Sequence, residues 1–379
     1  MQIYLHVNAI QQKLAGIGRY SYELAKGLLA HSAIDVKLFA RGLFDKPLAD
    51  FMAPSFYTNN KSKVRALPCI NTIRHLFLKL EAFKLNRKIK DKSQAIYHAP
   101  NFIIHQVKIP TVATIHDFSF IHYPEFHPKD RVAFFRQHLT STIHQAHHLI
   151  TDSEFIRQEL LRLYAVSPDK VTAVPLGISA AFKSVTGKNI QTTLVKYHLQ
   201  PKQYCLAVST LEPRKNFKNL LLAYANLPED IQIAYPLVLV GSAGWLSEDL
   251  HKTIARLQLD KKLQYLGYVD EADLPAIYAG AKAFLYPSIY EGFGLPIIEA
   301  MASGTAVLTS NISSMPEVAS GAAFLIDPNV VSAITHGLEK ILTDEALNSD
   351  LMIKGKKVAE KSTWQNCIEK TINVYQALI

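Results

Sequence analysis

Short apolar segments alternate with longer amphipathic segments along this chain, and the alternation occurs as two successive series. The expected strands of the first series are Ile3–Val7, Asp35–Ala40, Ala95–His98, Thr111–His116, His148–Thr151 and Lys170–Val174. Those of the second series are Tyr204–Ser209, Pro236–Val240, Leu263–Leu266, Ala283–Tyr286, Ala306–Thr309 and Ala323–Ile326. Helical patterns separate them, for example at Tyr20–Ala30, Arg131–Ala146, Glu154–Tyr164 and Asn216–Ala225. Such alternation is typical of parallel α/β sheets, so we predict two doubly wound domains.

A Ser/Thr/Gly/Lys-rich segment without periodicity, Ser179–Thr193, is the expected boundary between the two series. It divides the chain into domains of residues 1–182 and 183–361. The length of 379 residues also favours two domains. A last helical pattern at Trp364–Leu378 follows the second series of strands.

The composition excludes several classes of protein. Hydrophobic residues make up 49% of the chain and charged residues 19%, which excludes a disordered protein. Three widely separated cysteines (Cys69, Cys205 and Cys367) exclude a disulfide framework and favour a reducing compartment. No run of apolar residues is long enough for a transmembrane helix, and the N-terminus lacks the pattern of a signal peptide. We therefore expect a cytoplasmic protein.

The net charge of +9 is distributed unevenly. Residues 1–185 hold 24 Lys and Arg against 13 Asp and Glu, a net charge of +11, whereas residues 186–379 hold 17 against 19, a net charge of −2. The basic half predicts an anionic partner: a nucleic acid, a membrane surface or an anionic acceptor. Nucleic acid is the least favoured of the three, because aromatic residues do not interleave with the basic cluster as they do in nucleic-acid-binding motifs.

Ligands of open parallel sheets bind at the loops that follow the carboxyl ends of the strands. Gly16 and Gly18 lie in the first such loop, where glycines let a phosphate approach the backbone at a helix start. The third glycine of a dinucleotide fingerprint is missing, and a plain strand-to-helix turn is the alternative. His116 follows another strand; it can donate to a sugar hydroxyl or phosphate, act in proton transfer, or simply be packed in the loop.

Two cations follow the first strand of the second series. Arg214 and Lys215 suit a diphosphate, which an arginine binds bidentately and a lysine binds as a point charge. A solvated charge pair is the alternative interpretation.

The most informative loop is Tyr290–Ala300, with the sequence Tyr-Glu-Gly-Phe-Gly-Leu-Pro-Ile-Ile-Glu-Ala. Its glycines expose backbone donors at the start of a helix, and Pro296 suits the first helical position. Glu291 and Glu299 flank this helix start, which suits recognition of a nucleotide's sugar hydroxyls on both sides of a phosphate. A capping Glu and a surface Glu are the alternative.

The sequence lacks the motifs of several other nucleotide-binding and metal-binding sites. The chain has no Gly-Lys-Ser/Thr phosphate loop, no Asp-x-Asp pair and no Cys/His spacing typical of zinc. We therefore expect no metal site and no cofactor.

The motifs together resemble those of the retaining glycosyltransferases of family 4, which have the GT-B fold. The likeness covers nearly the whole chain and rests on Glu291–Glu299, Glu212–Asn216, Gly16–Tyr20, Thr114–Asp117 and Val174–Gly177. It implies two Rossmann-like domains that face a cleft. The N-terminal domain would lie on the acceptor side, the C-terminal domain would bind the nucleotide sugar, and the C-terminal helix, about residues 362–379, would cross back to the N-terminal domain.

The resemblance also implies a role for each matching residue. Arg214 and Lys215 would bind the donor diphosphate, and Glu291 would bind hydroxyls of the transferred sugar. The remaining donor contacts would come from His116 at the sugar, Glu299 at the ribose, Gly16 and Gly18 at the phosphates, the backbone of Phe293, Gly294 and Leu295, and Gly241, Tyr268 and Val269 near the base. No metal is implied, and the nucleotide sugar is a substrate rather than a cofactor. The transition state would resemble an oxocarbenium ion, with the leaving phosphate accepting the acceptor's proton.

The segment Arg74–Lys92 holds seven basic residues against Glu81 and Asp91. It predicts an amphipathic helix with a basic flank, through Leu76, Phe77, Leu80, Phe83, Lys84 and Arg87. Such a helix can lie on an anionic bilayer, whereas a solvated helix of the core is the alternative. Related family members act on lipid-linked acceptors, so we hypothesise that this segment docks the enzyme on the inner face of the cytoplasmic membrane.

The resulting prediction is a retaining glycosyltransferase that moves a hexose onto a saccharide or lipid-linked acceptor in bacterial surface polysaccharide or glycolipid synthesis. The likeness of His116–Phe120 and Tyr123–Glu125 to mannosyltransferase-like members favours mannose from GDP-mannose. The alternatives are a UDP-sugar-dependent glucosyl-, galactosyl- or N-acetylglucosaminyltransferase and a non-catalytic membrane-surface binding module. A nicotinamide oxidoreductase is disfavoured by the incomplete glycine fingerprint.

Overall fold

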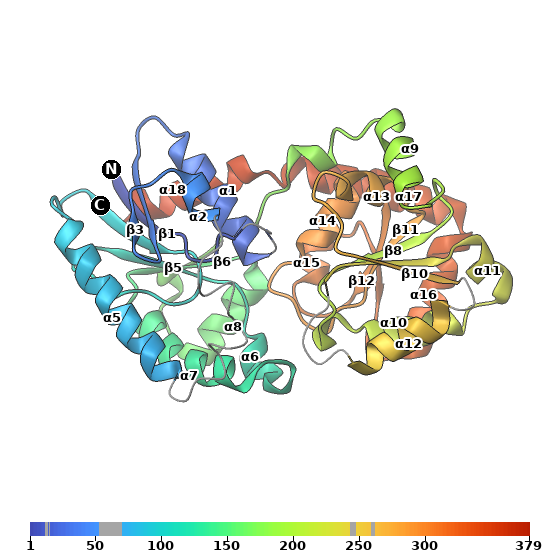
Figure 1. Cartoon of the computed structure of the whole chain (residues 1–379), viewed down its shortest axis with the longest axis horizontal. Helices are drawn as coiled ribbons and strands as arrows, with labels where there is room; N and C mark the ends of the chain where they lie inside the picture. Colours follow the sequence, from blue (N-terminus) through green and yellow to red (C-terminus); the bar gives the residue numbers. More distant parts are fainter. Residues whose placement is uncertain (12–13, 15, 53–69, 243–247, 259–261) are drawn as a thin grey trace. The chain divides into compact units, whose positions relative to one another are not determined.

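The computed structural model describes the whole chain except residues 12–13, 15, 53–69, 243–247 and 259–261. The chain forms two compact units (Figure 1): Met1–Gly177 with Trp364–Ile379, and Ile178–Thr363. The expected boundaries were residues 182 and 361. Ile178 belongs to the second unit because it forms a parallel bridge with Thr363.

The first unit is built on a seven-stranded sheet with the order β3-β2-β1-β4-β5-β6-β7. Its strands are β1 (Gln2–His6), β2 (Asp35–Ala40), β3 (Leu43–Phe44), β4 (Ala95–Ala99), β5 (Thr111–Ile115), β6 (His148–Thr151) and β7 (Val171–Ala173). All neighbours are parallel except β2 and β3, and in register Ile3 lies between Val36 and Ile96. The short antiparallel β3 was not predicted, because two residues carry too little alternation to be recognised. The strand order reverses between β1 and β4, which makes the carboxyl end of β1 a switch point where ligands can bind.

Helices cover both faces of this sheet (Figure 1). They are α1 (Ile17–Leu29), α2 (Leu48–Met52), α5 (Ile70–Lys88), α6 (Ser119–His122), η1 (Pro124–Phe126), α7 (Lys129–Gln145), α8 (Glu154–Tyr164), η2 (Pro168–Lys170) and α18 (Trp364–Gln376). Helix α8 begins at Glu154 because the hydroxyl of Ser153 accepts the Ile156 N–H. Helix α1 starts at Ile17, three residues before the expected Tyr20, on an N-cap glycine.

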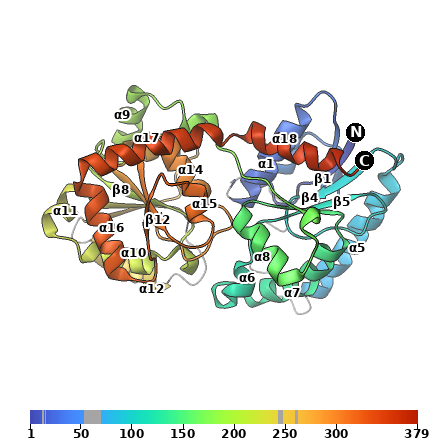
Figure 2. The same cartoon turned by 180° about the vertical axis from the view of Figure 1, so that it is seen from behind.

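The C-terminal helix α18 packs on the first unit, alongside α1 (Figure 2). A Cβ at Gly27 of α1 would lie 1.9 Å from Cδ1 of Ile368, so the glycine allows the close approach of the two helices. Deeper in the same interface, Nδ1 of His98 lies 2.6 Å from the hydroxyl oxygen of Tyr375. The expected return of the last helix to the N-terminal domain is thus confirmed.

The second unit has a six-stranded, all-parallel sheet with the order β10-β9-β8-β11-β12-β13. Its strands are β8 (Cys205–Val208), β9 (Leu237–Val240), β10 (Leu263–Gly267), β11 (Ala283–Tyr286), β12 (Ala306–Ser310) and β13 (Phe324–Ile326). Its helices are η3 (Ala180–Phe182), α9 (Gly187–Lys196), η4 (Pro213–Lys215), α10 (Phe217–Ala225), α11 (Glu229–Ala234), α12 (Glu248–Gln258), α13 (Leu274–Gly280), α14 (Leu295–Ala302), α15 (Met315–Ala319), α16 (Val331–Thr343) and α17 (Glu345–Lys361).

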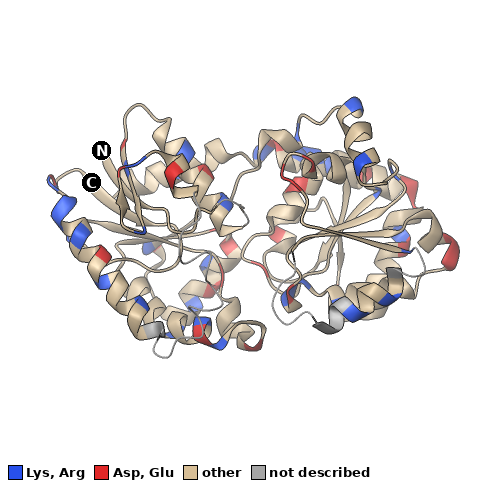
Figure 3. Ribbon diagram, in the orientation of Figure 1, with Lys and Arg blue, Asp and Glu red and all other residues tan. Residues whose placement is uncertain are grey.

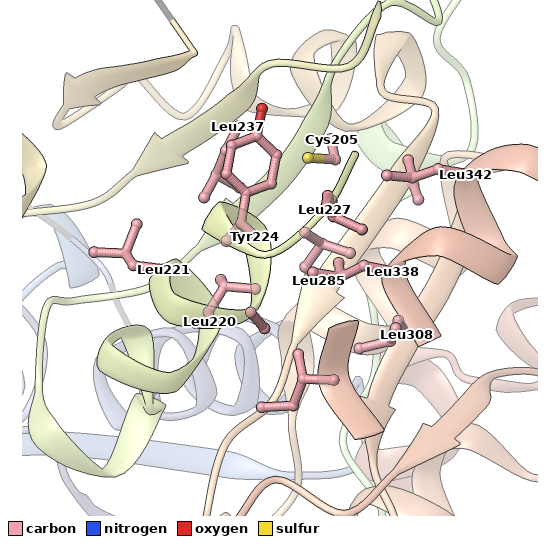
Figure 4. Packing of buried hydrophobic residues seen from close by; sticks show 14 of the residues in the cluster. Cys205, Leu220, Leu221, Tyr224, Leu227, Leu237, Leu285, Leu308, Leu338 and Leu342 are labelled. Carbon is pink, nitrogen blue, oxygen red and sulfur yellow. The ribbon is translucent and has the colours of Figure 1, made fainter. Parts of the chain in front are cut away.

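The core of the second unit lies between its sheet and the helices on one face. Leu220 and Tyr224 of α10 and Leu338 of α16 pack there against Leu285 and Leu308 of the central strands (Figure 4). Continuous apolar strands of this kind are expected where helices cover both faces of a parallel sheet. Among the described residues, no helix is both long and apolar enough to cross a membrane.

Candidate functional site

A buried cluster of charged side chains lies at the carboxyl ends of β8 and β11 in the second unit. The ammonium of Lys215, in η4 after β8, donates to Oε1 of Glu291 at 2.6 Å and to the hydroxyl of Tyr286 at 2.7 Å. Tyr286, the last residue of β11, donates in turn to Oε1 of Glu291 at 3.0 Å. Lys215 and Glu291 are only 9% and 5% exposed, so this ion pair is shielded from water.

Arg214 holds the other oxygen of the same carboxylate. Its Nη1 donates to Oε2 of Glu291 at 2.7 Å and to the carbonyl of Tyr290 at 3.2 Å, and its Nε donates to Glu212 at 3.2 Å. The backbone joins the two loops as well, because the N–H of Ile289 donates to the carbonyl of Arg214. The predicted pair of cations and the first predicted carboxylate therefore come together as one unit.

The electrostatics of the cluster keep Glu291 ionised. Burial raises the pKa of this carboxyl, but the charges of Arg214 and Lys215 outweigh burial and lower the pKa to about 2. Burial and the charge of Arg214 lower the pKa of Lys215. Burial and the Glu291 charge raise the pKa of Tyr286 well above its ordinary value, so its phenol remains a donor. The arrangement fixes two cations and an anion in a water-poor site, where charge interactions are strong.

The loop from Glu291 to Gly294 is shaped by two serines from the loop after β12. Ser313 accepts the N–H of Glu291 at 3.0 Å and donates to its carbonyl at 2.7 Å, while Ser314 donates to the carbonyls of Glu291 and Phe293. Gly294 has a φ of 109°, which favours glycine, and it is the N-cap of α14.

Helix α14 starts at Leu295, so Pro296 is its second residue rather than the expected first. The backbone N–H groups of Phe293, Gly294 and Leu295 lie at this helix start, where a helix offers donors to anions. One turn further on, Glu299 accepts a hydrogen bond of 3.0 Å from the hydroxyl of Tyr278, in α13. Glu299, the second predicted carboxylate, is therefore positioned by a hydrogen bond from Tyr278.

The predicted base-binding residues lie in the loops after β9 and β10. Gly241 has a φ of 145°, and a Cβ there would lie 1.9 Å from the carbonyl oxygen of Ser209. Glycine is therefore required by the close approach of two strand ends. Tyr268 is 45% exposed, whereas Val269 is buried.

His116 lies in the first unit and is almost fully buried. Its Nδ1 lies 2.7 Å from Oδ2 of Asp152, and its Nε2 lies 3.0 Å from the carbonyl oxygen of Pro100. Burial lowers the pKa of His116, but the Asp152 carboxylate and the Pro100 carbonyl raise it by more. Both ring nitrogens are thus engaged within this unit.

Gly16 and Gly18 open α1 in the same unit. Gly16 is exposed, with a φ of 46°, and is the N-cap of the helix. A Cβ at Gly18 would lie 3.0 Å from the carbonyl oxygen of Ala9, so this glycine lets the loop after β1 pack closely on the helix start.

Several residues of these sites were missed by the sequence analysis. Asp152 directly follows β6, and Tyr286 ends β11, so a search for polar residues at every strand end would have found both. Ser313 and Ser314 carry no such signal, because only the folded loop shows which carbonyls they meet.

The fold consists of two parallel α/β sheets, with a buried charged cluster at the strand ends of the second, and the sequence comparisons give the family. A sequence model described as "Glycosyltransferase Family 4" matches residues 14–182, and one described as "Glycosyl transferases group 1" matches residues 193–358. O-antigen chain mannosyltransferase B of Escherichia coli is 36% identical over 388 residues, covering 100% of both chains. O-antigen chain mannosyltransferase RfbU of Salmonella typhimurium is 24% identical and covers 83% of each chain. The protein belongs to glycosyltransferase family 4 and resembles its mannosyltransferases.

Solved structures support the GT-B fold. Sucrose-phosphate synthase of Thermosynechococcus elongatus superposes with a TM-score of 0.76 at 19% identity, covering 100% of this chain and 98% of the other. HepE of Anabaena, in complex with UDP and glucose, superposes with a TM-score of 0.72 at 17% identity over the whole of both chains. The predicted fold class is therefore confirmed.

Proposed function

We propose that this glycosyltransferase transfers mannose from GDP-mannose, with retention, to a saccharide or lipid-linked acceptor of bacterial surface polysaccharide synthesis. The observation that carries the proposal is the buried cluster of Arg214, Lys215 and Glu291 at strand ends beside the start of α14. The choice of mannose is supported by the full-length relative whose name is O-antigen chain mannosyltransferase B.

Each charged group of the cluster has a role in this proposal. The donor diphosphate accepts hydrogen bonds from Arg214 and Lys215, which stabilise the charge that develops on the leaving nucleotide. Before the donor binds, Glu212 and Glu291 neutralise these cations and hold their side chains in place. Preorganised cations contribute more to catalysis than mobile ones, because no reorganisation accompanies the reaction.

We assign the remaining contacts to the residues that match the family's motifs. Glu291 accepts from hydroxyls of the transferred sugar, and Glu299 accepts from the ribose. The start of α14 supplies backbone donors, the glycines of the first unit line the phosphates, and the base lies near Gly241, Tyr268 and Val269. His116 contacts the sugar, the leaving phosphate accepts the acceptor's proton, and the proposal assigns no role to a metal.

Donor turnover tests the proposal. The purified protein is assayed for nucleotide release with GDP-mannose, UDP-glucose, UDP-galactose and UDP-N-acetylglucosamine, with a lipid-linked or free saccharide acceptor. We expect turnover of GDP-mannose; exclusive use of a UDP-sugar refutes the choice of donor. Binding without release of nucleotide from any donor would support a non-catalytic module instead.

The stereochemistry and the site are tested separately. NMR of the product should show an α-mannoside from the α-linked donor, and a β-mannoside would contradict retention.

Glu291→Ala should lower kcat by at least about 100-fold, as removal of preorganised polar groups does in other enzymes. Full activity of this variant would refute the site assignment.

We further propose that α5 docks the enzyme on an anionic membrane. The helix runs from Ile70 to Lys88 rather than over the expected Arg74–Lys92, so Lys90 and Lys92 follow its end. Ala82, Leu85 and the adjoining Ile89 are buried. The opposite face is exposed and apolar, with Ile73 50%, Leu76 58%, Phe77 50%, Leu80 49% and Phe83 61% exposed.

Exposed basic residues lie on the same helix as these exposed apolar residues. Lys79, Lys84, Arg87 and Lys88 lie on the same helix, which Figure 3 shows as a run of blue segments at the edge of the first unit. Apolar side chains on such a face can insert into the headgroup region of a bilayer. Each lysine or arginine near anionic lipids adds about 1 kcal/mol to the binding free energy.

Vesicle flotation tests the membrane proposal. Vesicles containing phosphatidylglycerol should bind the protein, and high salt should weaken the binding, whereas neutral vesicles should bind it poorly. Phe77→Ser combined with Phe83→Ser should abolish binding without affecting the transfer of mannose to a water-soluble acceptor. Equal, salt-insensitive binding to neutral and anionic vesicles would contradict the proposal.

A further inference from the structure

Three polar side chains far apart in the sequence meet inside the first unit, at the carboxyl end of β1. His6 ends β1, Glu81 lies on α5, and His105 lies in the loop after β4. Nε2 of His105 lies 3.2 Å from Oε2 of Glu81, and Nε2 of His6 lies 3.9 Å from the same oxygen. The three candidate ligand atoms all lie within 4.8 Å of one another.

The imidazole of His6 is the unexplained member of this group. It is 3% exposed, and its Nε2 has no hydrogen-bond partner among the described residues. Its ring stacks on Phe39 with a centroid distance of 4.9 Å and meets the ring of His105 edge-on at 4.6 Å. A buried, unsatisfied ring nitrogen is costly, so its place beside a carboxylate and a second imidazole needs an explanation.

The hydroxyl group of Tyr97 fixes the position of His105. Its Nδ1 lies 2.7 Å from the hydroxyl oxygen of Tyr97, which also accepts the backbone N–H of His105 at 3.2 Å. Histidines that bind metals in proteins have their other ring nitrogen held in this way by a polar group. Two imidazoles and a carboxylate are also the ligand set that divalent zinc and its neighbours prefer.

The surrounding charges have opposing effects on a cation. Arg41 repels a cation, and Glu81 is the carboxylate that opposes this charge. A cavity of about 80 Å³ has His105, Lys79 and Ala82 in its lining, although the side chain of His105 itself is fully buried.

We propose that Nε2 of His6, Oε2 of Glu81 and Nε2 of His105 bind one divalent transition-metal ion, with Zn²⁺ as the best match, and that water fills the fourth position. Ligand distances of about 2.0–2.2 Å require the three atoms to lie closer together than they do in this structure. The ion would join the end of β1, helix α5 and the loop after β4. This site lies outside the residues assigned to the sugar donor, and it does not depend on the proposed transfer reaction.

Metal binding by the tag-free, full-length protein tests this proposal. After chelation and equilibrium dialysis against Zn²⁺, we expect one Zn²⁺ per chain and a rise of about 5 °C in the thermal unfolding midpoint at saturating metal. Co²⁺ should give visible absorption bands of a bound, low-coordinate ion. These readouts do not require turnover, so they stand whether or not the chain transfers mannose.

Three variants make the test specific. Glu81→Gln keeps the side-chain size and should weaken Zn²⁺ binding by more than about 100-fold, whereas Tyr97→Phe, which acts through His105, should weaken it by about 10-fold. His138→Gln is the matched control, because it removes an imidazole from a second histidine pair, in which His75 and His138 stack at 5.4 Å. Binding below one ion per chain, or equal binding by the wild type and Glu81→Gln, would overturn the proposal. If Glu81→Gln fails to fold, Tyr97→Phe decides by the same comparison.

Discussion

The ammonium nitrogen of Lys215 lies 2.6 Å from Oε1 of Glu291, although 76 residues separate the two in the chain. Each follows a different strand of the same parallel sheet, and the strand order β8-β11 makes these strands neighbours. Arg214 binds the second oxygen of the carboxylate, so the ion pair is a three-membered cluster. Its geometry leads to the first two predictions.

Glu291→Ala should destabilise the second unit by about 3–5 kcal/mol, because it leaves the buried Lys215 and Arg214 without their shared anion. Urea unfolding followed by far-UV circular dichroism measures the change. Glu229→Ala is the control: Glu229 is a largely exposed partner of Lys262, and its loss should change stability by less than about 0.5 kcal/mol. Equal effects of the two substitutions would contradict the view that burial makes the Glu291 cluster important.

The stability that Glu291 contributes should depend on pH in the acid range. Its pKa in the folded protein is about 2 against an ordinary value of 4.5, so the contribution is complete above about pH 4.5 and is lost as the pH falls towards 2. At 1.36 kcal/mol per unit, this shift corresponds to about 3 kcal/mol. The difference in unfolding free energy between wild type and Glu291→Gln should therefore shrink between pH 5 and pH 2; a constant difference would refute the shifted pKa.

Tyr375→Phe should destabilise the first unit by about 1–3 kcal/mol. The substitution removes the hydroxyl that meets Nδ1 of His98 at 2.6 Å, and the buried imidazole is left with an unsatisfied nitrogen. Thermal unfolding measures the loss. Asn373→Ala, at an exposed position of the same helix, should change stability by less than about 0.5 kcal/mol. A neutral Tyr375→Phe would show that apolar packing alone holds α18 in place.

Gly241→Ala should cost about 1–3 kcal/mol and weaken nucleotide binding. A methyl group at this position collides with the carbonyl oxygen of Ser209, at 1.9 Å, and the φ of 145° is strained for alanine. Chemical unfolding and a thermal-shift assay with GDP and UDP measure the two effects. Gly187→Ala is the comparison, since a Cβ there meets nothing within 4 Å, and this substitution in α9 should be neutral or stabilising. A neutral Gly241→Ala would show that the two strand ends can separate.

Much of the fold was predictable because its signals are local. Apolar runs such as Ala283–Tyr286 and Ala306–Thr309 match the observed β11 and β12 to within a residue, since strands buried on both faces consist mostly of apolar residues. Helix ends were less accurate: Asn216 was the expected start of a helix, yet it has a φ of 60° and precedes α10 as its N-cap. Cap geometry depends on the backbone conformation of single residues, which periodicity does not report.

The sequence also predicted which loops bring charged side chains together, because the carboxyl ends of parallel strands share one edge of a sheet. Arg214, Lys215 and Glu291 were found by that reasoning, and the structure joins them directly. Their hydrogen-bond partners depended on the tertiary structure, as did the tyrosine and serines that hold the loops.

The group of His6, Glu81 and His105 shows the limit most clearly. The sequence by itself determined the two parallel sheets, the strand-end loops and the family, because periodicity and short motifs are local properties of the chain. It predicted no metal site, since His6 and Glu81 are 75 residues apart (81 minus 6) and no spacing rule joins a strand end to the middle of a helix. Only the tertiary structure decided that these side chains meet, because their distance depends on how α5 packs beside the sheet and on the path of the loop after β4.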